Sequence, residues 1–301
     1  MPNSACRAYG NLCFWQFLIK AVRLAVAAVS LALAGAPMRA SAEEPITELL
    51  KAEKFTELDE RLSTVQKKFE AGTLGEIELR NAFRPFYNLR GVEAEKLRTF
   101  AAAASRSYVA HLALGIYFKR RGLDARGETS WRDVPFADRS RMESAFEDAL
   151  KELKASLPLT PKPYLSAFHL LHVAVYLGQQ QEALVLLREG NKMLPDNGLI
   201  RGRYATSLTP RWGGSYQQLD RFIAETKSEG APPSVLLQLD AIREDDIGLT
   251  FWEQHDRQQA EPRFERALEL AKQVGGSFAE DFLPTSLDAM CRGTHHSPLC
   301  P

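Results

Sequence analysis

The chain has 301 residues, of which 45% are hydrophobic and 25% are charged, proportions that are ordinary for a folded protein with a substantial core. Its formal net charge is zero, but the first 42 residues hold four basic side chains and no acidic one, which leaves 34 basic and 38 acidic residues in the rest. A mildly acidic body argues against a nucleic-acid partner, because nucleic-acid-binding proteins present a basic face.

The N-terminal residues have the parts of an export signal. Basic Lys20 and Arg23 precede an uncharged run at residues 24–36, and an Ala-Ser-Ala tripeptide ends at Ala42. This run is shorter than the ~20 residues that a helix needs to cross a bilayer. We therefore predict signal cleavage after Ala42 and a mature chain that is periplasmic or secreted and does not span the membrane. An uncleaved membrane anchor is the alternative.

The body of the chain has a helical pattern. Apolar residues recur at helical spacing from Pro45 to about Phe282, and no alternating strand pattern of useful length occurs. A first helix is expected to begin at Pro45 and to end before Gly72. Thr73 and Glu76 have the T-x-x-E spacing of a capping box, which predicts the start of a second helix.

Residues 105–121 predict a helix with one broad apolar face. Its last turn carries three consecutive cations, Lys119, Arg120 and Arg121. We interpret this run as a solvated helix end, where cations favour the helix dipole, followed by Gly122 as the cap. Residues 123–138 are then expected to form a shaped loop, and the helical pattern resumes over residues 139–156.

Two stretches have the marks of helix–turn–helix hairpins. Residues 164–177 form the most apolar helix, which should lie at the centre of the packing, and Gly178 separates it from a second helix at residues 180–194. Small residues at matching positions, with a second unit at residues 241–272, are similar to tetratricopeptide repeats. The expected fold is therefore all-α, a degenerate tetratricopeptide-like α-solenoid of stacked hairpins. Its organisation is a signal peptide at residues 1–42, a helical repeat domain at 43–275 and a tail at 276–301.

A turn at residues 209–216 combines proline, an indole, two glycines and a helix-capping serine. Its candidate binding residues are Arg211, Trp212, Gly213, Gly214, Ser215 and Tyr216. Ser215 and Gln218 have capping-box spacing, so a helix should begin at Tyr216, and the glycines before it could turn several N–H groups and Arg211 towards an anion. In the alternative reading, Trp212 fills the space between two hairpins and Arg211 pairs with a carboxylate.

These features resemble a bacterial family known as domain of unknown function 4034. The resemblance covers roughly residues 46–274. It is carried by Arg126, Gly127 and Trp131, by the tetratricopeptide-like hairpin, and by the string from Leu208 to Tyr216. It implies a mostly helical, often exported protein and brings no activity with it. Arg126 and Trp131 join the candidate binding residues on this basis.

Two groups of side chains could hold a metal ion. His169 and His172 form H-x-x-H on a helix, but the glutamate and spacing of H-E-x-x-H are missing, so we expect buried, hydrogen-bonded histidines, with a metal pair as the alternative. Near the C-terminus, Cys291 and Cys300 flank a His-His pair. Because an exported chain meets an oxidising environment, we predict a disulfide between the two cysteines, with a metal site or a free tail as alternatives.

The sequence contains no nucleophile elbow, phosphate-binding glycine loop or dinucleotide fingerprint, and it implies no cofactor. An acidic run at residues 244–246 is expected to be a solvated helix face. The expected function is a protein- or peptide-binding module of the cell envelope, because stacked hairpins create a binding groove. The alternatives are a metal-dependent hydrolase that uses His169 and His172, and a structural envelope component.

Overall fold

The computed structural model describes residues 45–127 and 134–275. By its internal contacts the chain divides into residues 1–45 and residues 46–301, and every described helix belongs to the second unit. The described residues form twelve α-helices and three short 3-10 helices, with no strand among them, which confirms the all-α prediction. None of these helices is both long and apolar enough to cross a membrane.

The first half of this unit contains α2 (Ile46–Lys51), α3 (Phe55–Glu70), α4 (Glu76–Phe83), η1 (Arg84–Tyr87), α5 (Gly91–Ala103), α6 (Tyr108–Arg126) and α7 (Phe136–Ser156). The second half contains η3 (Leu157–Leu159), α8 (Tyr164–Tyr176), α9 (Gln180–Met193), α10 (Leu199–Ser207), η4 (Pro210–Trp212), α11 (Tyr216–Ser228), α12 (Pro233–Glu253) and α13 (Arg257–Val274).

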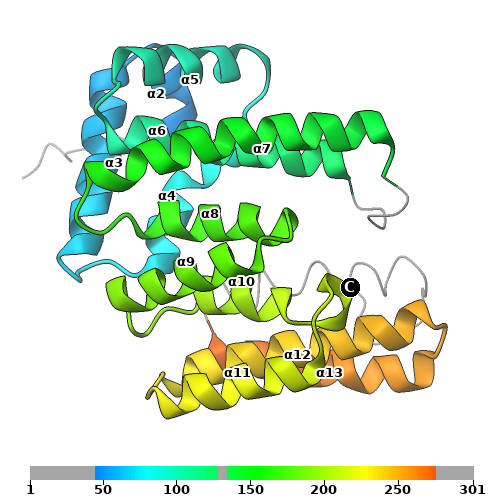
Figure 1. The fold of residues 1–301 in the computed structure, drawn as a ribbon. Coiled ribbons are helices and arrows are strands. Elements are labelled where there is room, and N and C mark those ends of the chain that lie inside the picture. The colour runs from blue at the N-terminus through cyan, green and yellow to red at the C-terminus, as the bar shows by residue number, and fades with distance from the viewer. Residues whose placement is uncertain (1–44, 128–133, 276–301) are drawn as a thin grey trace, which may run out of the picture. The chain divides into compact units, whose positions relative to one another are not determined.

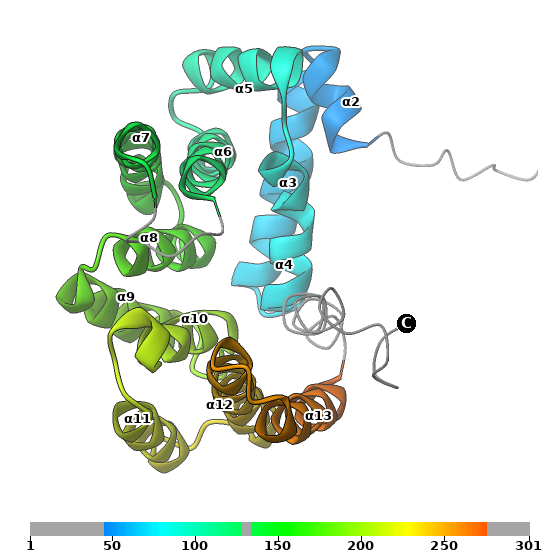
Figure 2. The same cartoon turned by 90° about the vertical axis from the view of Figure 1, so that its right-hand side faces the viewer.

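The helices pack as stacked hairpins (Figure 1). The largest contacts join α6 with α7, α8 with α9 and α12 with α13, and α6, α8, α10 and α12 also contact one another in succession. Figure 2 shows α7, α9 and α11 on the outer side of α6, α8 and α10. The predicted stack of hairpins is therefore present, with α6, α8, α10 and α12 as an inner row.

Small residues allow the paired helices to approach closely. A Cβ atom added to Gly122 would lie 2.4 Å from the ring of Phe146 on α7, and one added to Gly248 would lie 2.8 Å from Phe264 on α13. Gly122 is therefore an interior packing residue of α6, and its assignment as the cap was wrong. The helix continues for another turn, and Gly127, with φ +67°, follows its last residue.

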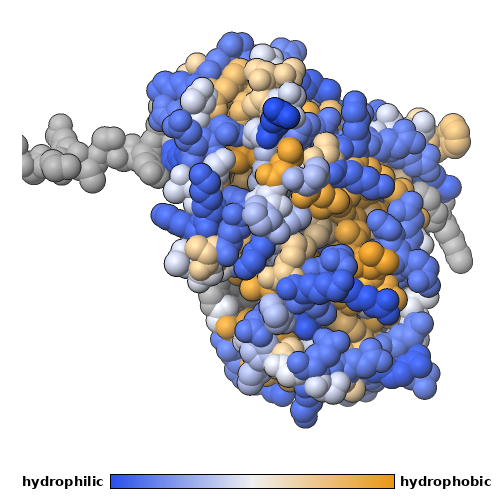
Figure 3. All heavy atoms as spheres, turned by 60° about the vertical axis from the view of Figure 1, so that its left-hand side comes forward, coloured by the Kyte–Doolittle hydropathy of each residue, from blue (hydrophilic) through white to orange (hydrophobic). Residues whose placement is uncertain are grey.

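The central helix is α8, as its composition predicts. Every residue from Tyr164 to Val175 is buried, so this helix is surrounded on all sides. Some apolar side chains reach the surface, and Figure 3 shows them gathered in a band between polar ones. One hollow in this unit is lined by Leu187, Tyr204 and Phe222.

Two expected helix boundaries near the N-terminus were wrong. The first helix divides into α2 and α3, separated by Glu53 in a left-handed conformation with φ +56°. Thr73 does not cap α4, because its hydroxyl donates to the carbonyl of Lys68 at 3.0 Å and the N-cap residue is Gly75.

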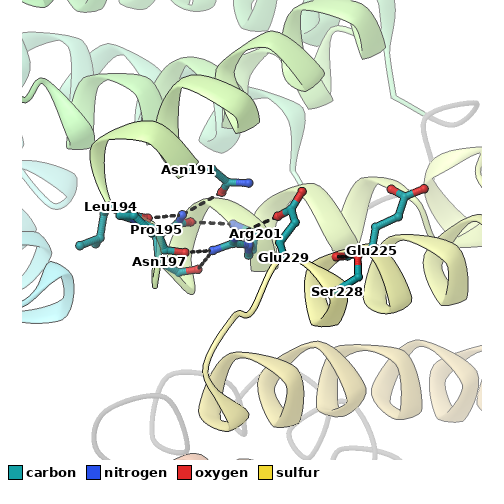
Figure 4. A network of polar contacts seen from close by, with 8 residues as sticks. All are labelled: Asn191, Leu194, Pro195, Asn197, Arg201, Glu225, Ser228 and Glu229. Atoms are coloured by element: carbon teal, nitrogen blue, oxygen red, sulfur yellow. Dashed lines mark hydrogen bonds and ion pairs between the residues drawn. The ribbon is translucent and has the colours of Figure 1, made fainter.

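Polar side chains fix the turn between α9 and α10 (Figure 4). Asn197 donates to Asn191 Oδ1 at 2.9 Å and to Leu194 O at 2.7 Å. Arg201, only 3% exposed, donates to the carbonyl of Pro195 and pairs with Glu229 at 3.1 Å. The guanidinium of Arg201 therefore holds the chain at this turn.

Glu76 closes the start of α10 from a distant part of the chain. Its carboxylate accepts the N–H of Gly198 at 2.7 Å and that of Leu199 at 3.3 Å, and it also accepts the hydroxyl of Tyr164. Burial, the largest influence, raises the pKa of this carboxyl, while the donated hydrogen bonds oppose the rise. Glu76 was expected to cap its own helix, α4, but it caps α10 instead, through the N–H of Gly198, 122 positions later.

Candidate functional site

A lysine and two histidines meet inside the inner row of helices. Lys119 on α6 is 1% exposed, and His169 and His172 on α8 are 0% and 7% exposed. Lys119 Nζ lies 3.1 Å from His169 Nδ1 and 3.2 Å from His172 Nδ1. The three-residue spacing of the histidines places both rings on one face of α8, where both contact the same ammonium group.

The charge of Lys119 decides which ring nitrogens carry protons. When Lys119 is an ammonium group, which has only donors, the Nδ1 atom of each histidine accepts from Lys119 and its Nε2 atom bears the hydrogen. His169 Nε2 lies 3.3 Å from the hydroxyl of Tyr87, which can accept that hydrogen. His172 Nε2 is buried and has no hydrogen-bond partner among the described residues.

Two arginines extend this group along neighbouring helices. Arg80 on α4 and Arg203 on α10 are both partly exposed. Arg80 hydrogen bonds to Tyr87, whereas Nε of Arg203 is buried without a partner in the described part of the chain. We refer to Arg80, Lys119, His169, His172 and Arg203 as the cationic cluster; these residues lie on α4, α6, α8 and α10.

The cluster disfavours any further positive charge. Burial, followed by the charges of Arg203 and Arg80, holds the pKa of Lys119 well below its usual range. Burial and the charge of Lys119 likewise lower the pKa of His169, and burial and Arg203 lower that of His172. The charged neighbours that act on Lys119 and His169 are all cations. Buried charge without a counter-charge is costly, and such arrangements concentrate at functional sites.

The histidine pair is not arranged as a metal site. The prediction of buried, hydrogen-bonded histidines is confirmed, and Lys119 Nζ lies where a metal ion shared by the two Nδ1 atoms would have to sit. Among the described residues, no group of three His, Cys, Asp or Glu side chains is placed to hold a metal. The geometry therefore gives the hydrolase alternative no support in this part of the chain.

Tyr176, at the end of α8, joins the cationic cluster to two residues selected from the sequence. Its ring lies 5.2 Å from the ring of His172 and 4.9 Å from that of Trp212, which meets it edge-on. The guanidinium of Arg126, at the end of α6, lies 5.6 Å from the Tyr176 ring on the cation–π side. Arg126 and Trp212, 86 positions apart in the sequence, thus contact the same aromatic ring. All three side chains are partly exposed.

The turn after α10 has the shape that its sequence predicts. Gly213 is left-handed, with φ +86°, and Ser215 accepts the N–H of Gln218 at 3.2 Å, so α11 begins at Tyr216 as expected. Arg211 pairs with Glu253 at the end of α12, at 3.2 Å. Because both side chains are exposed, this pair stabilises the turn little.

Tyr216 ties the turn to α12 through a buried acid. Its hydroxyl donates to Asp246 at 3.0 Å and lies 3.1 Å from the hydroxyl of Thr250. Burial raises the pKa of Tyr216 to about 12 and also raises the pKa of Asp246, which is 7% exposed. The expectation that residues 244–246 form a solvated face was therefore wrong for Asp246.

Several residues selected from the sequence lie outside the described ranges. These are Trp131, Cys291 and Cys300, together with the histidines between the two cysteines and the whole of residues 1–42. The predicted disulfide and signal cleavage therefore remain predictions.

Lys119 was not predicted as a site residue. It was expected at a solvated helix end, but α6 continues to Arg126 and Lys119 is buried. A signal was present: Lys119 follows Ile116 by three positions and Leu112 by seven, so it lies on the apolar stripe of the helix. Asp246 repeats this relation, four positions after Ile242 and seven after Leu239.

Comparison with known proteins identifies one family. The model described as "Domain of unknown function (DUF4034)" matches residues 42–197, about half of the chain. The matched part contains Arg126 and the histidine pair, whereas the string from Leu208 to Tyr216, which carried much of the resemblance, lies beyond it. Neither the curated proteins nor the solved structures contain a match.

Proposed function

The chain belongs to the DUF4034 family, and we propose that it is an exported, tetratricopeptide-like module that binds an acidic peptide segment of a partner protein in the cell envelope. Two features support export: the signal-like N-terminus, and a family match that begins at residue 42, where the predicted signal peptide ends.

The meeting of Trp212, Tyr176 and Arg126 is the observation that carries the binding proposal. Two aromatic rings at 4.9 Å and a guanidinium at 5.6 Å form one partly exposed group at the end of the inner row. Tryptophan, tyrosine and arginine are the residues most enriched among those that dominate protein interfaces. Arg203 and Arg80 of the neighbouring cationic cluster are also partly exposed, so charge complementarity favours an acidic segment.

Fluorescence polarisation with a labelled acidic peptide that contains aromatic residues would test this proposal. A peptide of the same length with each Glu replaced by Lys provides the charge-reversed comparison. We expect saturable binding of the acidic peptide alone, weakened about tenfold by Arg126→Gln, a loss typical of an interface hot spot. Trp212→Ala should weaken it similarly. Arg188→Gln, at an exposed position of α9, removes an equal charge elsewhere and should have no effect.

Equal binding of the two peptides, or unchanged binding by Arg126→Gln, would overturn the peptide proposal. The export part has its own test, because N-terminal sequencing of the exported protein should begin at Glu43. A chain that retains residues 24–36 would instead be membrane-anchored.

A further inference from the structure

The cationic cluster has more hydrogen-bond donors than acceptors. Lys119 has three N–H groups, of which two are directed to histidine Nδ1 atoms at 3.1 and 3.2 Å. Those contacts leave Nε2–H of His172 as a donor, and the ring is buried without a partner for that atom. Nε of Arg203 is a second buried donor without a partner in the described chain. Each unmatched atom at the cluster is therefore a donor.

We propose that Lys119, His172 and Arg203 form a binding site for a tetrahedral oxyanion with two negative charges, such as phosphate or sulfate, with Arg80 at its edge. The charge of the cluster favours a dianion, because Arg80, Arg203 and the ammonium form of Lys119, which a bound anion would stabilise, lie together while both histidines are neutral. The donors come from three different helices, α6, α8 and α10, so they can contact separate oxygens of a tetrahedral ion. This arrangement suits a tetrahedral ion better than a planar carboxylate.

Part of the cluster reaches solvent. Lys119 and the two histidines are buried, whereas Arg80, Tyr87, Arg203 and Tyr176 are partly exposed. An ion entering from solvent would meet Arg80 and Arg203 first and Lys119 and His172 at greater depth. The two proposals share Arg80 and Arg203, but Arg126 and Trp212 do not belong to the oxyanion site, so variants of these two residues test the peptide proposal alone.

Calorimetric titration of the mature chain with sodium sulfate and sodium phosphate, at constant ionic strength, tests the site. Acetate serves as the planar monoanion, and phosphoserine as a phosphate attached to an organic group. We expect one sulfate or phosphate per chain. Lys119→Met and Arg203→Met should each weaken binding at least tenfold, and acetate should bind at least tenfold more weakly than either dianion. Arg221→Gln, which removes an exposed charge on α11, should bind as the wild type does.

Thermal melts in sulfate separate binding from folding. Sulfate stabilises most proteins by exclusion from their surfaces, so only a rise in melting temperature that is larger for the wild type than for Lys119→Met reports the site. Arg203→Met changes a partly exposed position, so it keeps the test decisive if Lys119→Met does not fold.

The outcomes divide cleanly. Tighter binding of phosphoserine than of phosphate would support the site and identify a phosphorylated ligand as its source, whereas the reverse would support it as a site for the free ion. Acetate binding as tight as sulfate would overturn the proposal, and so would the absence of saturable binding by any of the three tetrahedral probes. Arg126→Gln should leave oxyanion binding intact while weakening peptide binding, so the two proposals can fail separately.

Discussion

The two glycines of the turn after α10 should differ in their response to the same substitution. Gly213 has φ +86°, and a Cβ atom added there would have no neighbour within 4 Å. A Cβ atom added to Gly214 would lie 2.2 Å from the carbonyl oxygen of Leu208 and 2.5 Å from its carbonyl carbon. Glycine is therefore required at position 213 because of the backbone conformation, and at position 214 because there is no space for a side chain.

Each cost follows from that difference. Gly213→Ala places an L-residue in the left-handed region, which costs about 1–2 kcal/mol. Gly214→Ala sets a methyl group against backbone that cannot rotate away, so the turn must open by roughly 1 Å. Overpacking of this kind costs about 1–3 kcal/mol. The hydrogen bond from Gly214 N to Thr209 O, at 3.1 Å, would weaken as well, which adds about 1 kcal/mol. We expect a total of about 2–4 kcal/mol.

Urea unfolding followed by far-ultraviolet circular dichroism measures both free-energy costs. Each cost is obtained from the shift of the unfolding midpoint, provided that the slope of the free energy against urea concentration is unchanged. Gly230→Ala is the matched control, because Gly230 has φ +82° and no neighbour within 4 Å of an added Cβ atom. It should lose as much stability as Gly213→Ala. A Gly214→Ala protein as stable as Gly213→Ala, or more stable, would refute the close contact with Leu208.

Three further predictions concern other parts of the chain. The folded pKa values of His169 and His172 lie well below 6.5. As pH falls from 7 to 5.5, the unfolded chain therefore takes up protons that the folded chain does not, at a cost of about 1.3 kcal/mol per histidine. The charged groups that face the two histidines from α4, α6 and α10 are cations, which also oppose protonation of the rings. Replacing both histidines by Phe should therefore reduce the stability lost between pH 7 and pH 5.5, measured by urea unfolding at the two pH values. An unchanged loss would contradict the burial of the histidines as neutral rings. Glu76→Ala should cost about 2–3 kcal/mol in the same assay, because it leaves two N–H groups at the start of α10 without acceptors, and Glu76→Gln should cost less; equal costs would argue against the cap. Mass analysis after thiol blocking should show Cys291 and Cys300 protected until reduction, and two free thiols in the exported protein would exclude the disulfide.

Local sequence patterns were sufficient to predict the fold. The apolar composition of residues 164–177 predicted the central helix, and the spacing of Ser215 and Gln218 predicted the first residue of α11. Small residues were expected between the helices of the second hairpin, at residues 241–272, and Gly248 there leaves no room for a Cβ atom beside the ring of Phe264. These predictions succeeded because each depends on residues close together in the sequence or on the period of a single helix.

The cationic cluster could not be predicted in the same way, because its members come from distant segments. Lys119 contacts side chains 50 and 53 positions later, and one sequence does not show which helix faces which. The charge run that contains Lys119 also favoured a solvated helix end, and Gly122 suggested that the helix stopped there. Position on the apolar stripe is a stronger guide to burial than residue type, provided that the helix is followed through its glycine.

Lys119 should reduce the stability of the folded protein for the sake of the site. Its ammonium is buried beside two neutral histidines and near Arg203 and Arg80, and burial with those charges lowers its pKa. Replacing buried ionic groups by apolar side chains of similar volume often stabilises a protein, by about 1–4 kcal/mol where a buried ion pair is replaced. We therefore expect Lys119→Met to unfold at a higher urea concentration than the wild type in a buffer free of phosphate and sulfate, although it binds oxyanions more weakly. A variant that is more stable but binds more weakly than the wild type indicates that the replaced residue is retained for function. A Lys119→Met protein that is less stable than the wild type in that buffer would instead make Lys119 a structural donor to the two histidines.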